Sequence, residues 1–278
     1  MDDRIAIRTM TRVDLDRAID CAAAEGWNPG LDDAAPFRAA DPDGFLMAFR
    51  DGAPVACISA VAYGARFGFL GFYICAAEQR GRGFGMAVWR VALDRLGDRV
   101  IGLDGVVAQQ DNYRKSGFVL AHRNVRYGGT VAIDERADPR IVPIDGTLRD
   151  AIVAYDQPFF PGPRRAFLEA WLTPARRRGL AYVEDGAVRG YGVVRACRNG
   201  HKIGPLFADD AAIADALFRA LAAEAGGGPV FLDPPESNRA LPERYGLEPV
   251  FETARMYRGP APALPLARLY GITTFELG

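Results

Sequence analysis

The sequence predicts an α/β protein made of two similar domains, each with a mixed, mostly antiparallel sheet flanked by helices. The first supporting observation is an internal repeat. Asp51-Gly52-Ala53, which precedes an apolar run, recurs 134 residues later as Asp185-Gly186-Ala187, and Leu103-Asp104 recurs 129 residues later as Leu232-Asp233. The second observation is the order of β-type and helix-type patterns within each copy. Together they predict a duplicated domain.

The border between the two domains is predicted in the polar stretch 134–138. Pro139 and Pro143 follow this stretch and flank a new β-type run, and such residues mark loops and boundaries. The prediction is a first domain at residues 1–133 and a second domain at residues 140–278, each of ordinary size.

The first elements can be justified from local patterns. Residues 4–8 alternate like a strand, and Thr11 with Asp14 three residues later has the form of a capping box. Apolar residues then recur at helical spacing until Gly26, where the run Trp27-Asn28-Pro29-Gly30 ends the helix. Two β-rich runs, 45–50 and 54–63, are joined by Asp51-Gly52, which predicts a hairpin.

Further elements complete the copy. They are a strand over 67–75, a helix over 87–96, a strand over 100–103, a short helix over 112–115 and a last strand over 118–127. Near the end of the chain, residues 269–277 form another β-type run that pairs with one of the two sheets.

Composition excludes several classes of function. Lys and Arg number 34 and Asp and Glu number 35, giving a net charge of -1, so we expect neither nucleic acid nor a membrane surface as partner. The four cysteines form no CxxC pair, which predicts reduced thiols and no metal site. The longest apolar run is about half the ~20 residues of a membrane span. We therefore expect a cytoplasmic protein.

The segment 78–86 lies between a strand-type run and an amphipathic helix, and it contains three glycines. Glycines let the backbone approach a ligand closely, and a helix N-terminus offers free N–H groups and the positive end of the helix dipole. Arg80 and Arg82 add positive charge. The pattern predicts a site for a phosphate or pyrophosphate.

Three kinds of loop could form such a site. A P-loop requires Gly-Lys-Ser/Thr, and no lysine is near. A dinucleotide loop counted from Gly81 has Met86 in place of its last small residue, although Asp104 follows the next strand. The third pattern, RxxGxG, is matched by Arg80, Gly83 and Gly85. In this the sequence resembles the GNAT superfamily of N-acetyltransferases, whose acetyl-coenzyme A pyrophosphate rests on this loop.

The resemblance covers residues 4 to 128 and extends to a bacterial two-domain subgroup. It implies a binding loop for acetyl-coenzyme A formed by Arg80, Gly81, Arg82, Gly83, Phe84, Gly85 and Met86. Many members have an asparagine for the pantetheine arm where this chain has Val106. The arm is therefore expected on the backbone of Tyr73, Ile74 and Cys75. Residues 113–118 are similar to the Tyr…Gly-Phe pattern of the superfamily, which implies that Tyr113 protonates the departing thiolate.

An amine that attacks a thioester also needs to lose a proton. Asp104 at a strand end and Glu25 near the first helix break are candidate bases, and a water chain is the alternative.

The second half has lost the glycine loop. Residues 206–212 stand in its place, and Asp209 and Asp210 would repel a pyrophosphate. We expect this half to cover the substrate cleft, with Trp27, Asn28, Phe159 and Arg164 binding the acceptor.

The sequence as a whole predicts an N-acetyltransferase that moves acetyl from acetyl-coenzyme A to a primary amine of a small molecule by direct attack on the thioester. Two alternatives are an NAD(P)-dependent oxidoreductase with Asp104 on the ribose, and a non-catalytic module that binds an acyl-coenzyme A. A homodimer is compatible with the sequence.

Overall fold

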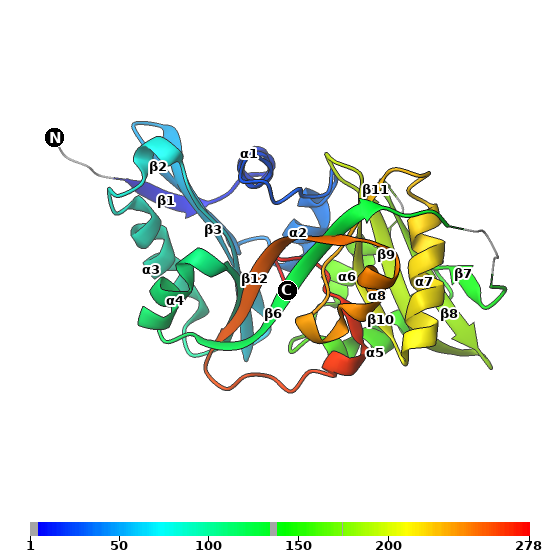
Figure 1. Ribbon diagram of the computed structural model, residues 1–278. Coiled ribbons are helices and arrows are strands. Elements are labelled where there is room, and N and C mark those ends of the chain that lie inside the picture. The colour runs from blue at the N-terminus through cyan, green and yellow to red at the C-terminus, as the bar shows by residue number, and fades with distance from the viewer. Residues whose placement is uncertain (1–4, 134–137, 174) are drawn as a thin grey trace.

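The computed structural model of the protein describes residues 5–133, 138–173 and 175–278. Helices and strands recur in the same order in its two halves (Figure 1). The first half contains β1 (Ala6–Thr9), α1 (Arg12–Ala24), α2 (Ala34–Ala40), β2 (Phe45–Arg50), β3 (Ala53–Tyr63), β4 (Phe67–Cys75), η1 (Ala77–Gln79), α3 (Phe84–Leu96), β5 (Val100–Val106), η2 (Val107–Gln109), α4 (Gln110–Lys115) and β6 (Val119–Thr130). The second half contains β7 (Ile141–Pro143), α5 (Arg149–Asp156), η3 (Gln157–Phe159), α6 (Arg165–Trp171), β8 (Arg177–Glu184), β9 (Ala187–Ala196), β10 (His201–Ala208), α7 (Ala211–Ala223), β11 (Pro229–Leu232), η4 (Glu236–Asn238), α8 (Ala240–Arg244), β12 (Glu248–Arg258), η5 (Leu266–Arg268) and β13 (Leu269–Gly271).

Local predictions and structure differ in a few places. The capping box of α1 is present, with the Asp14 N–H donating to Thr11 Oγ1 at 3.2 Å and the Thr11 N–H to Asp14 Oδ2 at 2.9 Å. The short helix α2 is absent from the prediction, because its 7 residues form only about two turns and show no clear apolar period. The strand predicted over 269–277 ends at Gly271, so the prediction is wrong for the residues that follow. Further along, the Gly278 N–H donates to the Thr274 carbonyl at 3.1 Å and closes a turn. The predicted domain border falls largely on residues 134–137, outside the described residues.

The two halves exchange their last strands. The strand order in the described residues is β1-β2-β3-β4-β5-β12-β6-β11-β10-β9-β8-β7, so β12 of the second half lies between β5 and β6 of the first. In turn, β6 pairs with β11 of the second half. Figure 1 shows β6 and β12 crossing the middle of the molecule side by side. One continuous sheet therefore joins both halves.

A pair of buried ion pairs anchors this exchange, and the repeat supplies both. Asp104 on β5 binds Arg255 on β12, with Nε and Nη2 donating to its two oxygens at 2.8 and 2.6 Å. The equivalent residues 129 positions away form the reciprocal pair, Arg126 on β6 with Asp233, at 2.7 Å for both bonds. Such bidentate bonds satisfy buried charges and fix the strand register.

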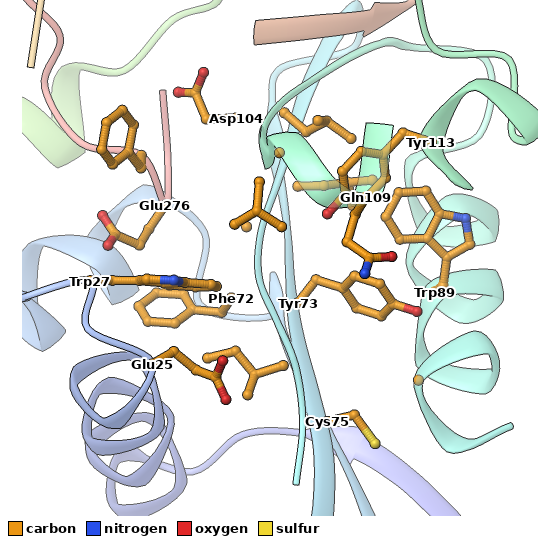
Figure 2. A pocket seen from close by; sticks show the side chains of 18 of the residues that line it. Glu25, Trp27, Phe72, Tyr73, Cys75, Trp89, Asp104, Gln109, Tyr113 and Glu276 are labelled. Atoms are coloured by element: carbon orange, nitrogen blue, oxygen red, sulfur yellow. The ribbon is translucent and has the colours of Figure 1, made fainter. Parts of the chain in front are cut away.

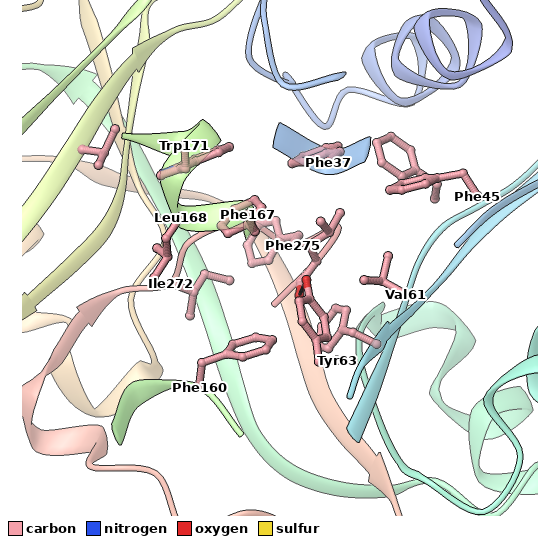
Figure 3. Packing of buried hydrophobic residues seen from close by; sticks show 14 of the residues in the cluster. Phe37, Phe45, Val61, Tyr63, Phe160, Phe167, Leu168, Trp171, Ile272 and Phe275 are labelled. Atoms are coloured by element: carbon pink, nitrogen blue, oxygen red, sulfur yellow. Dashed lines mark hydrogen bonds between the residues drawn. The ribbon is translucent and has the colours of Figure 1, made fainter. Parts of the chain in front are cut away.

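The halves also share a hydrophobic core. Trp171 on α6 is fully buried, and its ring stacks on Phe37 of α2 with centroids 6.3 Å apart. Figure 3 shows the side chains of both halves meeting around Phe275. Because apolar burial is the dominant favourable term in folding, we expect the halves to fold as one unit.

Residues 272–278 leave the second half and insert against the first. The Tyr63 hydroxyl donates to the Leu277 carbonyl at 3.1 Å and Ser59 Oγ donates to the Glu276 carbonyl at 3.4 Å. A Cβ at Gly71 on β4 would lie 2.0 Å from that Glu276 oxygen. Only glycine at position 71 lets this segment come so close.

Replacing Gly71 by alanine is therefore expected to lower the free energy of unfolding by about 1–3 kcal/mol, because the methyl group overpacks a rigid backbone contact. Thermal unfolding followed by circular dichroism measures the effect. Gly146→Ala is the control, since a Cβ there would meet nothing within 4 Å. Equal melting temperatures for the two variants would contradict the seating of residues 272–278 on β4.

Candidate active site

A pocket of about 490 Å³ lies where β4 and β5 separate (Figure 2). One wall comes from β4, the following loop and α3. Residues of β12 and of segment 272–278 close it from the other side, so both halves of the chain form the pocket.

The opening follows from the strand pairing. Strands β4 and β5 are parallel and pair only from Phe67 to Leu70, whereas β4 continues to Cys75. Beyond Leu70, no strand in the described residues pairs with β4 on that edge. The backbone groups of β4 that face this edge therefore lack a strand partner within the described residues, although the Cys75 carbonyl accepts a bond from Arg80 Nε. Groups of a strand edge without a strand partner bind another extended chain readily.

A β-bulge in β4 places two consecutive side chains in different parts of the pocket. Phe72 and Tyr73 together stand opposite Ile58 of β3, and Phe72 has a φ of 47°, which is rare for a residue with a side chain. Phe72 lies on the side of Trp27, and Tyr73 lies on the side of Trp89, with ring centroids 5.1 Å apart (Figure 2). Consecutive side chains therefore line two parts of the pocket.

The glycine loop opens into the pocket at the start of α3. Gly81 and Gly83 have φ of 75° and 85°, in the left-handed region that favours glycine. Gly83 is the N-cap of α3, and no side chain caps the helix there. Gly83 and the first residues of α3 line the pocket, so the N-terminal end of the helix, which carries the positive end of the helix dipole, lies at the pocket. This arrangement suits a phosphate.

Two arginines of the loop have different roles. Arg80 lines the pocket mouth, where its Nη2 donates to Glu25 Oε1 at 2.6 Å and its Nε donates to the Cys75 carbonyl at 3.1 Å. Arg82 is directed to Gln79 Oε1 at 2.9 Å and does not line the pocket. Apart from Arg82, every predicted cofactor-binding residue lines the pocket, namely Tyr73, Ile74, Cys75, Arg80, Gly81, Gly83, Phe84, Gly85 and Met86.

Tyr113 lies on α4 at the same pocket. Its ring stacks on Trp89 with centroids 5.6 Å apart and covers Gly105, where a Cβ would lie 2.2 Å from the ring. Burial raises the pKa of the Tyr113 phenol to about 12. The hydroxyl therefore keeps its proton at physiological pH and can act as an acid.

The chain can be placed among known proteins on this evidence. The acetyltransferase (GNAT) family model matches residues 12–118, and the model of an acetyltransferase (GNAT) domain matches residues 152–271. Holothin acyltransferase from Pseudoalteromonas sp. (strain SANK 73390) is 32% identical over 261 residues, covering 92% of this chain and 89% of that protein. This chain belongs to the GNAT superfamily.

Solved structures share the fold over nearly the whole chain. A putative acetyltransferase from Pyrococcus horikoshii superposes with a TM-score of 0.83 at 24% identity, covering 100% of this chain and 97% of that one. A tandem GNAT protein from the clavulanic acid biosynthesis pathway gives 0.63 at 14% identity, covering 93% and 100%. With a GNAT model matched in each half and the 32% identical acyltransferase relative, the protein is a tandem GNAT acyltransferase. This family assignment favours acyl transfer over the nicotinamide alternative.

The second half of this tandem GNAT protein is closed at the equivalent place. Its α7 starts directly after β10, and the N-cap Asp210 accepts a bond from the Ile213 N–H at 2.9 Å. Strand β13 pairs with β10 at Leu206 and Phe207, so the chain itself fills the gap that stays open between β4 and β5. The pocket at β4 has no counterpart of this form in the described part of the second half.

The predicted bases lie at the pocket in different surroundings. Both carboxylate oxygens of Asp104 are bound by Arg255, and Asn124 Nδ2 adds a bond at 2.9 Å. Burial raises the pKa of Asp104, and the Arg255 guanidinium opposes this. Glu25 forms its ion pair with Arg80 at the mouth. Neither carboxylate is free in the described structure, so each would have to release an arginine to accept a proton.

Of the predicted acceptor residues, only Trp27 lines the pocket. Asn28 joins the halves instead, donating to the Asn199 carbonyl at 2.8 Å. Phe159 stacks on Phe207 in the core at 4.2 Å, and Arg164 is buried on Asp156 with bonds of 2.8 and 2.5 Å. The prediction placed these three by analogy within the repeat. Apolar burial and charge pairing hold Phe159 and Arg164 in the interior, whereas Asn28 lies nearer the surface in its contact with Asn199.

The sequence reasoning missed the residues that the second half supplies to the pocket. They are Phe251 and Thr253 from β12 and Phe275 and Glu276 from segment 272–278. One signal was present, because Glu276 is the single charged residue in the β-type run 269–277. The described residues contain no group of three or more His, Cys, Asp or Glu side chains that could hold a metal. They also contain no helix long and apolar enough to cross a bilayer.

Proposed function

We propose that this protein transfers an acetyl group from acetyl-coenzyme A to a primary amine of a small molecule, in the cytoplasm. The observation that carries the proposal is the uncapped start of α3, with its left-handed glycines, opening into the same pocket as Tyr113. It unites an anion-binding site with a proton donor.

The residues present fit acetyl-coenzyme A. Gly81, Gly83 and the first turn of α3 would hold the pyrophosphate, because they line the pocket at the uncapped N-terminus of a helix. The backbone of Tyr73 to Cys75 would hold the pantetheine arm, since no strand in the described part of the chain pairs with β4 on that edge. When bound, the coenzyme supplies an acyl group activated as a thioester.

Tyr113 holds the proton that the thiolate leaving group needs. A phenol with a pKa of about 12 is a weak acid, but it is in the protonated form throughout the neutral range. Its ring is fixed by Trp89 and by the close approach to Gly105, so the hydroxyl keeps one position. Fixed donors of this kind lower the barrier because no reorganisation is needed during the reaction.

The relatives and the pocket both support a small acceptor. The 32% identical relative is named for acylating holothin, and a structural neighbour comes from clavulanic acid biosynthesis. The pocket is closed on one side by β12 and segment 272–278. A volume of about 490 Å³ is in the usual range for small-molecule sites.

Isothermal titration calorimetry with acetyl-coenzyme A tests the proposal, with coenzyme A and NAD as parallel ligands. We expect one acetyl-coenzyme A per chain, because the gap in the second half is filled by β13. A thiol-release assay with primary amines then tests transfer. Two bound molecules per chain would contradict the assignment of the site to the first half, and binding without turnover on any amine would favour a non-catalytic acyl-coenzyme A module.

A further inference from the structure

Glu276 is an unusual member of the pocket lining. Its side chain is 2% exposed, and neither carboxylate oxygen has a hydrogen-bond partner within the described residues. Figure 2 shows the side chain beside Trp27. A buried carboxylate without a partner costs several kcal/mol unless something compensates it. A group retained in this state at a pocket wall points to a ligand that supplies the missing donor.

The surroundings of Glu276 offset its charge without bonding to it. Arg126, Arg195 and Lys202 interact with it electrostatically. Arg126 is already bound to Asp233, and Arg195 forms an ion pair with Asp33 at 3.3 Å. Lys202 Nζ donates to the Trp27 carbonyl at 3.4 Å. The carboxylate oxygens thus remain available as acceptors.

The charges of the pocket lining favour a cation over an anion. Its acidic members are Glu25, Asp104 and Glu276, and Arg80 is the single basic side chain among the described residues that line it. Arg80 is bound to Glu25 at the mouth, and Asp104 is neutralised by Arg255. An ammonium or amine group therefore finds an acceptor in Glu276, whereas a carboxylate finds no unpaired basic side chain among the described residues that line the pocket.

The remaining wall near Glu276 is aromatic. Trp27, Phe72, Phe251 and Phe275 all line the pocket, and the rings of Phe251 and Phe275 meet edge to face at 5.8 Å. Aromatic walls bind flat apolar groups, and the faces of aromatic rings also attract cations.

We propose that Glu276 binds the amine of the acceptor, and that the acceptor is an amine on a flat apolar body with no carboxylate beside the amine. This deepens the proposed acyl transfer and rests on it. Segment 272–278 gives the second half a direct part in acceptor selection, since it is fixed on β4 by Gly71, Ser59 and Tyr63.

The test compares tryptamine with L-tryptophan, which differ by one carboxylate, in calorimetric titrations of the protein saturated with coenzyme A. We expect tryptamine to bind at least about tenfold more tightly, because the carboxylate has no partner in the pocket. Glu276→Gln is expected to weaken tryptamine binding about tenfold or more while leaving the acetyl-coenzyme A affinity within about twofold. Glu248→Gln is the matched control, an exposed glutamate on β12 outside the pocket lining.

Equal affinity for the two ligands, or full tryptamine affinity in Glu276→Gln, would overturn the proposal. Trp27→Leu is a second variant that keeps the test valid if Glu276→Gln misfolds, and it too should weaken tryptamine binding. Turnover is scored separately by thiol release. Absence of acetylation of every amine, with the binding preference intact, would remove the proposed function alone; acetylation of both ligands with equal affinity would remove this inference alone.

Discussion

Gly83→Asp is expected to abolish measurable binding of acetyl-coenzyme A. The new carboxylate would stand at the uncapped N-terminus of α3, where the pyrophosphate is proposed to bind. Two charges about 4 Å apart near a protein surface repel by about 4 kcal/mol, which corresponds to a loss of affinity of roughly 1,000-fold. Isothermal titration calorimetry of the purified variant measures the loss.

Gly97→Asp is the matched control for that variant. Gly97 lies at the other end of α3 and also has a positive φ, and a Cβ added there would likewise meet no atom within 4 Å. Gly83 lies in the left-handed region, with φ 85° and ψ -4°, where a side chain costs about 1–2 kcal/mol. Gly97, with φ 57° and ψ -129°, lies outside that region, so aspartate there is expected to strain the backbone at least as much. We expect both to lower the melting temperature and only Gly83→Asp to lose the ligand. Wild-type affinity in Gly83→Asp would refute the placement of the pyrophosphate.

Tyr113→Phe is expected to reduce kcat about 100-fold or more, the usual effect of removing a general acid. The affinity for acetyl-coenzyme A should stay unchanged, because the phenylalanine ring keeps the contacts with Trp89 and Gly105. Since the phenol pKa is raised to about 12, the acid form persists as pH rises. The wild-type rate should therefore show no loss from Tyr113 ionisation below about pH 11. Steady-state thiol-release kinetics across pH measure both effects.

Tyr127→Phe provides the control for this experiment. Tyr127 lies on β6 outside the pocket lining, with its hydroxyl donating to Glu243 Oε1 at 3.3 Å. Removing the Tyr127 hydroxyl tests whether the loss of a buried tyrosine hydroxyl lowers kcat by disturbing the fold. A Tyr113→Phe enzyme with wild-type kcat would show that another group, such as water, protonates the thiolate.

Asp104 shows why the surroundings of a candidate base could not be predicted from the sequence. An acidic residue at the end of a strand beside a glycine loop is a reasonable candidate for a general base or a ribose ligand. The repeat of Leu103-Asp104 as Leu232-Asp233 indicated only that Asp104 and Asp233 have the same role in the two halves. The structure shows that role as a reciprocal pair of ion pairs with Arg126 and Arg255. Asp104 and Arg255 are 151 residues apart, so no local pattern connects them.

The residues predicted to bind the acceptor show the same limit. The repeat pointed to residues around Phe159 and Arg164, which pack within the second half. Residues that do reach the pocket, such as Phe251 and Glu276, come from an exchanged strand and from the segment after β13.

By itself, the sequence determined the duplication, the element order, the glycine loop at the start of α3, the position of Tyr113 beyond β5, and the loss of the loop in the second half. These features depend on neighbours within a few positions: left-handed glycines, capping residues and apolar period act locally. Tertiary structure alone decided that β6 and β12 change places, that β13 fills the second gap, and that Glu276 enters the first half's pocket. Equivalent strands of a repeat have nearly equal local preferences, so the choice between partners depends on packing and charge pairing between residues far apart in the chain.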